Sequence, residues 1–143
     1  MPNTEFRFTK NFFEGLKNQL IQDDKNENYC VILANSTDDI KANRIYFPDQ
    51  LIGFPESAYE RKGSVFLTLS SRNYKEVLKY FFSSDYKVLV SCHSHPFDNS
   101  GNVFFSGTDD SNDLNLFSEF RRIAATTEES DQYEMFSMVM TPK

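Results

Sequence analysis

The chain has 143 residues, of which 39% are hydrophobic, so it can bury one substantial core and we expect a single domain over residues 1–143. A net charge of −6, with no block rich in Lys or Arg, argues against nucleic acid or an anionic membrane as the main partner. Two cysteines make no disulfide framework and no apolar run reaches the length of a signal or membrane segment, which favours a cytoplasmic location.

The first half of the chain alternates helical and extended patterns. Apolar residues at helical spacing predict an amphipathic helix over Lys10–Ile21. Apolar runs predict strands at Tyr29–Leu33, at Arg44–Phe47 before Pro48, and at Val65–Leu69. The apolar stripe of the helix consists of Phe12, Phe13, Leu16 and Leu20.

The second half continues the alternation. A helix is expected from Ser70 or Ser71 to Ser83, a strand at Lys87–Cys92, a helix from Asp109 to about Ala125, and a strand at Tyr133–Met140. The predicted inward positions of the two helices are Tyr74, Val77, Leu78, Phe81 and Phe82, and then Leu116, Phe117, Phe120, Ile123 and Ala124. Strands interleaved with helices predict a layered α/β domain.

Both histidines of the chain, His93 and His95, lie two residues apart just after the apolar run Val88–Val90. If the strand extends to them, residues two apart point to the same face, roughly 6.5–7 Å apart at the backbone, so two imidazoles can converge on one metal ion. By the same alternation, Cys92 turns to the opposite face, which predicts a buried structural cysteine rather than a thiolate ligand.

A hydroxyl and a carboxylate follow at Ser106 and Asp109, where the last helix is expected to open. Asp109 precedes Leu116 by seven residues and so projects onto the inward face of that helix, whereas Asp110 falls nearer its edge. Asp113 also projects inward and is the reserve candidate if the helix begins later. The alternative interpretation of these residues is helix capping.

The combination His-x-His-Pro followed by Ser-x-x-Asp resembles the signature of the JAMM/MPN (JAB-domain) zinc metalloproteases. The segment from Phe105 to Asp110 is similar to the Phe-Ser-x-Thr-Asp-Asp of bacterial members, although the loop between Pro96 and Ser106 is somewhat longer than the family's common spacing. The resemblance implies a mixed sheet flanked by helices.

The resemblance also implies roles for individual residues. His93, His95 and Asp109 would be ligands of Zn²⁺, and Ser106 would donate a hydrogen bond to the tetrahedral oxyanion. The family's general base is a glutamate just before an early core strand, and the match here is Glu27. The neighbouring position is Asn28, and Glu14 is a poorer match because it belongs to the first helix.

Such enzymes hydrolyse peptide or isopeptide bonds at the C-terminus of ubiquitin and ubiquitin-like proteins. The implied substrate is therefore the C-terminal tail of a ubiquitin-like protein, with ubiquitin-like activating and conjugating enzymes of the same operon as further partners. Two alternatives stay open: a metal hydrolase similar to RadC-like proteins, and a non-catalytic MPN scaffold that binds a ubiquitin-like partner. A zinc deaminase is disfavoured because no Pro-Cys-x-x-Cys accompanies the histidines.

The strand-like run Met135–Met140 lies close to Lys143, whereas domains usually end in a freer tail. Bacterial members of the family are often joined to further segments. We therefore expect this chain to be the N-terminal piece of a longer protein.

Overall fold

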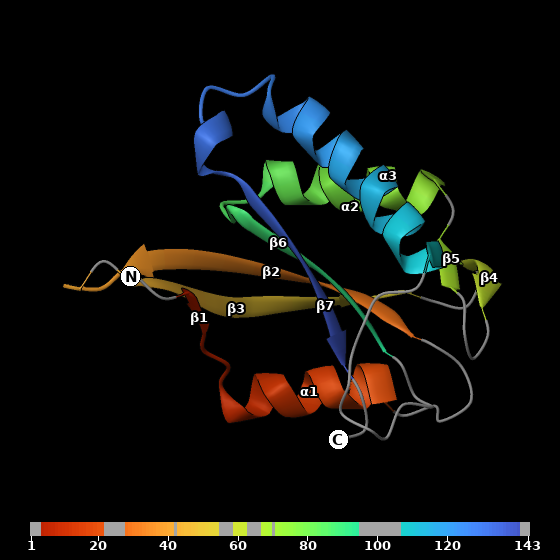
Figure 1. The fold of residues 1–143 in the computed structure, drawn as a ribbon, viewed down its shortest axis with the longest axis horizontal. Coiled ribbons are helices and arrows are strands. Elements are labelled where there is room, and N and C mark those ends of the chain that lie inside the picture. Colours follow the sequence, from red (N-terminus) through yellow and green to blue (C-terminus); the bar gives the residue numbers. More distant parts are fainter. Residues whose placement is uncertain are drawn as a thin grey trace.

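The computed structural model describes residues 4–21, 28–41, 43–54, 59–62, 67–69, 71–94 and 107–140, with side chains described except at 59–62, 67–69, 71 and 107–114. Five strands form one mixed sheet in the order β1-β3-β2-β6-β7 (Figure 1). They are β1 (Thr4–Phe6), β2 (Tyr29–Asp38), β3 (Arg44–Gly53), β6 (Val88–Ser94) and β7 (Glu134–Met140). β2 is antiparallel to β3 and β6, whereas β1 and β7 run parallel to β3 and β6 respectively.

Helices cover both faces of this sheet, which confirms the layered α/β class. Helix α1 (Lys10–Ile21) lies on one face, and α2 (Ser71–Ser83) and α3 (Gly107–Ala124) lie together on the other (Figure 1). A short 3-10 helix, η2 (Ser130–Gln132), links α3 to β7. Strands β4 (Tyr59–Lys62) and β5 (Leu67–Leu69) form a separate antiparallel pair.

The core is divided by the sheet into two clusters. The cluster between the sheet and α1 includes Leu16, Leu20, Cys30, Ile32, Val88, Val90 and Cys92. The cluster under α2 and α3 includes Tyr29, Val31, Leu33, Leu78, Phe81, Leu89, Leu116 and Phe120. Because successive residues of β2 and β6 alternate between the clusters, these strands read as continuous apolar runs, as expected for strands covered on both faces.

Two strands are longer than the sequence predicted. β2 and β3 form a long hairpin. The added residues of β2, 34–38, are mostly polar and exposed, and those of β3, 48–53, mix polar and apolar residues, so no apolar run marks either extension. The predicted end of β3 before Pro48 is wrong. The register shifts between Leu33 and Ala34, where Gln50 and then Pro48 are the successive partners, and a bulge of this kind accommodates proline within a strand.

Other boundaries differ by a few residues. β6 begins at Val88 and extends through His93 to Ser94, and α3 begins at Gly107 rather than Asp109. Strands β1 and β4 were not predicted from the sequence, because three or four residues carry too little pattern to be recognised. Residues 65 and 66 of the predicted strand Val65–Leu69 lie outside the described residues.

The predicted helix stripes are mostly buried, with two exceptions. In α2, Tyr74, Val77, Leu78 and Phe81 are all buried, as expected. Phe13 of α1 and Phe117 of α3 were predicted to face inward but are 45% and 37% exposed. The Phe13 ring contacts Phe8, which precedes α1, at 5.9 Å between ring centres, and Phe117 lines a hollow between α3 and β7.

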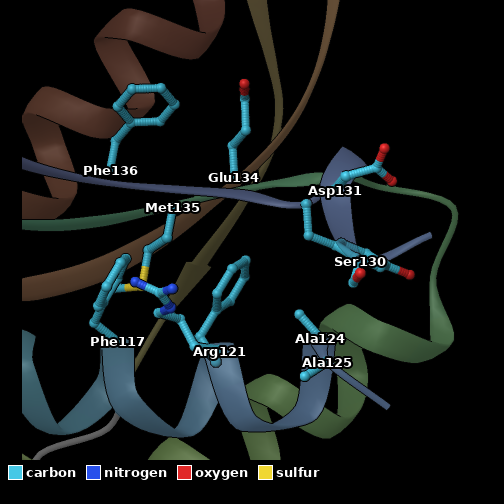
Figure 2. A pocket seen from close by; sticks show the side chains of 11 residues that line it. Phe117, Arg121, Ala124, Ala125, Ser130, Asp131, Glu134, Met135 and Phe136 are labelled. Carbon is cyan, nitrogen blue, oxygen red and sulfur yellow. The ribbon is translucent and has the colours of Figure 1, made fainter. Parts of the chain in front are cut away.

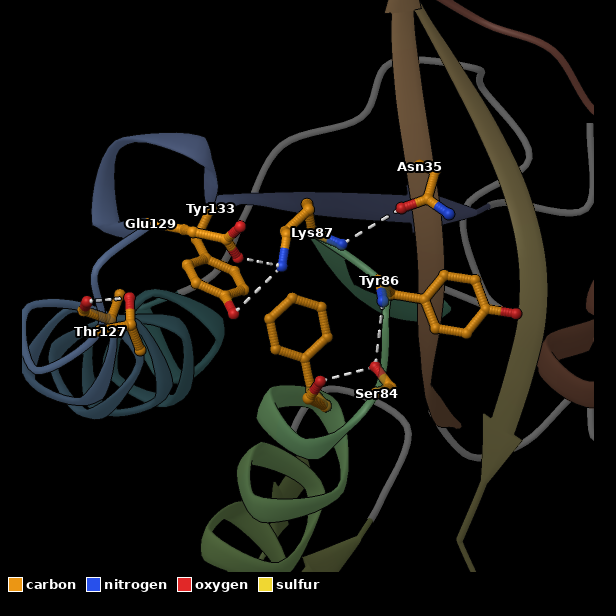
Figure 3. Close-up of polar contacts among 9 residues, drawn as sticks. Asn35, Ser84, Tyr86, Lys87, Thr127, Glu129 and Tyr133 are labelled. Atoms are coloured by element: carbon orange, nitrogen blue, oxygen red, sulfur yellow. Dashed lines mark hydrogen bonds and ion pairs between the residues drawn. The ribbon is translucent and has the colours of Figure 1, made fainter.

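A polar network fixes the start of β6 (Figure 3). Lys87 Nζ donates to Glu129 Oε2 at 2.7 Å, and the Tyr133 hydroxyl lies 3.4 Å away. The Glu129 carboxylate raises the pKa of Lys87 above its usual value, because it stabilises the ammonium form. The Tyr86 hydroxyl donates to Asp49 of β3, which raises the pKa of Tyr86 to about 12. These contacts hold β6 in register with the turn before β7.

Candidate metal centre

The end of β6 carries His93, the one predicted metal ligand whose side chain the structure describes. All seven residues of β6 are buried, because β2 and β7 flank the strand and helices cover both faces. His93 is 4% exposed and pairs with Tyr29 of β2 and Val139 of β7. The prediction of a buried apolar strand that leads to His93 is therefore confirmed.

Alternation along the strand places His93 on the face covered by α2 and α3. Leu89, four residues earlier, belongs to the cluster under these helices, and so does Tyr29 directly opposite His93. Ser91 lies between Leu89 and His93 on the same face, where its Oγ is 2.8 Å from the Tyr29 hydroxyl. Cys92 lies on the other face, fully buried in the cluster beneath α1 and in no disulfide, which confirms the prediction of a buried cysteine that faces away from His93.

Two reciprocal hydrogen bonds close the sheet next to His93. The Asn28 backbone N–H donates to Ser94 Oγ at 2.9 Å, and the Ser94 N–H donates to the Asn28 carbonyl at 3.0 Å. Both residues are buried. We call this pair the Asn28–Ser94 clamp. It fixes the start of β2 against the end of β6, from which the chain continues to Glu27 on one side and to His95 on the other.

The direction of α3 brings its first turn toward the same end of the sheet. Near the C-terminal end of α3, the ring of Phe120 lies 5.7 Å from Phe81 and 6.5 Å from Tyr133, the residue just before β7. β7 begins opposite Val88, at the start of β6. From its C-terminal end at Ala124, α3 runs back along the sheet for about 22 Å to Asp109, which is comparable to the length of β6, about 20 Å (Figure 1).

Asp109 occupies the third position of α3, in its first turn, and precedes the buried Leu116 by seven residues. That spacing is close to two full turns, so the two positions share a helix face. The side chain of Asp109 lies outside the described residues, as do those of Asp110 and Asp113. Glu27, His95 and Ser106 lie wholly outside them.

Among the described side chains no group of three His, Cys, Asp or Glu residues lies close enough to hold a metal ion. Of the three predicted ligands, this part of the chain includes the side chain of His93 alone. The structure thus positions one predicted ligand and the helix that bears another, and their convergence stays a prediction.

The perturbed ionisable groups of the described region lie elsewhere. Arg44, Tyr46, Tyr86 and Lys87 all have raised pKa values, for Arg44 chiefly through a hydrogen bond with Tyr46 and for Tyr46 chiefly through burial. Lys87 precedes His93 by six residues of extended chain, about 20 Å. This charge network supports the opposite end of the sheet and is separate from the candidate centre.

Sequence reasoning missed the residues that hold His93 in place. In the sequence, Asn28 stands out only as the neighbour of Glu27, and Ser94 is only the unspecified residue of His-x-His. Their pairing depends on the register of β2 against β6, which no local pattern reveals. The one signal in the sequence is the position of Ser94, a serine between two candidate ligands.

The clamp has a measurable consequence. Ser94→Ala should lower the free energy of unfolding by about 1–3 kcal/mol, because it removes the acceptor of a buried backbone N–H. Urea unfolding measures the change. Ser137→Ala, at an exposed position of β7, is the matched control and should be nearly neutral. Equal stability of the two variants would show that the clamp contributes nothing.

Comparison of the chain with protein-family models and with curated proteins finds no match. No described helix is long and apolar enough to cross a membrane.

Proposed function

We propose that this chain is a zinc-dependent peptidase of the JAMM/MPN type, with the MPN/JAB fold, that cleaves after the C-terminus of a ubiquitin-like protein. The observation that carries the proposal is the position of His93. It is buried at the end of β6, on the face covered by α3, and the helix that bears Asp109 runs toward that end. In the sequence motif, His93 and Asp109 occur together with His95 and Ser106.

The donor chemistry fits zinc. An imidazole buried at a strand end, a second imidazole two residues on and a carboxylate are ligand types found in catalytic zinc sites. Zn²⁺ held by His93, His95 and Asp109 would polarise the scissile carbonyl and lower the pKa of a bound water to about 7. The Asn28–Ser94 clamp would orient the ligands, since Ser94 is bonded covalently to both histidines.

The remaining residues handle protons and charge. Glu27 would accept the proton of the attacking water and deliver it to the leaving amine. In the chain it directly precedes Asn28 of the clamp. Ser106 would donate a hydrogen bond to the oxyanion as the carbonyl becomes tetrahedral, a contribution of about 3 kcal/mol for donors of this kind.

A direct test uses ubiquitin whose C-terminal glycine is joined by an amide bond to a fluorescent amine. The zinc-loaded chain is expected to release the amine, and a chelator is expected to stop the release. The same assay is repeated with ubiquitin-like proteins encoded beside this gene. If every probe stays intact after prolonged incubation with the zinc-loaded protein, the proposal is refuted. Binding of the probe without cleavage would instead indicate a scaffold.

A further inference from the structure

A second surface stands apart from the candidate metal centre and does not depend on the proposed function. β7 is the last strand of the sheet, and no other described strand pairs with its outer edge. Its sequence has one charge, at Glu134, and contains neither lysine nor proline. Such residues commonly protect an edge strand from pairing with another chain. Within the described residues, the edge of β7 is therefore open to an added strand.

The ladder between β6 and β7 shows which backbone groups are available. The Glu134 N–H donates to the Lys87 carbonyl at 2.9 Å, so Glu134 faces β6. In a parallel ladder, alternate residues bond to the same neighbour, and the outward groups belong to the residues between them. Met135, Ser137 and Val139 therefore direct their N–H and C=O groups outward. Ser137 is also the one exposed residue of β7.

A groove of about 600 Å³ lies beside this edge, between β7 and the C-terminal half of α3 (Figure 2). Phe117, Phe120, Ala124 and Met135 form the apolar part of its walls, and Arg121, Ser130 and Asp131 contribute polar groups. The volume is within the range of ligand-binding clefts. The pattern of the helix predicted a buried Phe117. Its side chain is exposed because it lines this groove.

Arg121 gives the groove its charge. Its guanidinium lies 5.5 Å from the centre of the Phe117 ring, and Figure 2 shows it beside Phe117 and Met135. It forms no ion pair within the described residues. Asp131 lines the other end of the groove and points away from Arg121 (Figure 2). The half of the groove next to Phe117 is therefore cationic.

The nearby carboxylates are already engaged with other cations. Glu119 accepts from Arg122 at 2.8 Å, and Glu129 accepts from Lys87 at 2.7 Å. Glu134 lies on the opposite face of the sheet, 3.6 Å from Arg44. Arg121 is thus left to pair with a carboxylate brought by a partner.

We infer that β7 and the α3 groove bind an extended acidic segment of another protein by strand addition. The segment hydrogen-bonds to Met135, Ser137 and Val139, inserts an apolar side chain beside Phe117, and places a carboxylate on Arg121. A second copy of β7 fits less well. Its one charge, on Glu134, lies on the α1 face of the sheet and cannot reach Arg121 on the α3 face.

The test is selection of a phage-displayed library of random heptapeptides on the full chain. Peptides that combine Asp or Glu with β-branched or aromatic residues are expected to be enriched. The best peptide, measured by fluorescence anisotropy, should bind Arg121→Glu about tenfold more weakly. Arg122→Glu is the matched control because it makes the same charge change on the neighbouring residue, and it should change the affinity less than twofold.

Ser137→Pro tests the strand edge. It removes an outward N–H while sparing the ladder to β6, so the protein should fold, which its melting temperature checks, and should lose the peptide. If Ser137→Pro unfolds, the affinities of Arg121→Glu and Arg122→Glu still test the inference. The inference is overturned if the enriched peptides lack acidic residues, or if both arginine variants lose the same affinity. It is also overturned if no peptide is enriched and the wild-type chain forms a dimer that Ser137→Pro dissociates.

Discussion

Glu27→Gln is expected to reduce cleavage of the ubiquitin amide by about 10²- to 10⁴-fold while the zinc content stays unchanged. The amide side chain cannot accept the proton of the attacking water, yet it is close in size to the carboxylate and holds no ligand position in the proposed centre. Initial rates and elemental analysis on the same preparation measure both quantities.

Glu14→Gln is the matched control for this change. Glu14 lies on the exposed side of α1, so its substitution should leave the rate unaffected. Full activity of Glu27→Gln would show that the base is another residue and that the alignment of the family's glutamate with the start of β2 is wrong.

Asp109→Ala is expected to lose the metal itself, because two imidazoles alone bind zinc more weakly than the three-ligand set. The zinc content should fall from about one per chain to a small fraction, and cleavage should fall with it. Asp110→Ala is the control at the next position of the same helix turn and should retain zinc. If Asp109→Ala keeps its zinc and Asp113→Ala loses it, Asp113 is the ligand.

Much of the fold follows from local patterns. The apolar stripes of α1 and α2 and the buried run of β6 mark elements long enough to be recognised, and the structure confirms them. β1 and β4 escape recognition because their pairing depends on partners elsewhere in the chain. The bulge next to Pro48 is likewise a property of the β2–β3 pair, so proline appeared to end a strand that continues.

The candidate metal centre was likewise predictable from local patterns only in part. Alternation along one strand was enough to place His93 and Cys92 on opposite faces. The Asn28–Ser94 clamp was not predictable, since it requires the register of two strands separated by 66 positions in the chain. The groove beside β7 also depends on long-range packing, because Phe117 lines it only where α3 passes the edge of the sheet.

The zinc content of the purified chain tests the central claim most directly. Elemental analysis should find one zinc per chain, or a metal-free preparation should take up one equivalent on titration. His93→Ala should take up little, since it removes a buried ligand. A wild-type chain that is metal-free and takes up no zinc would contradict the account.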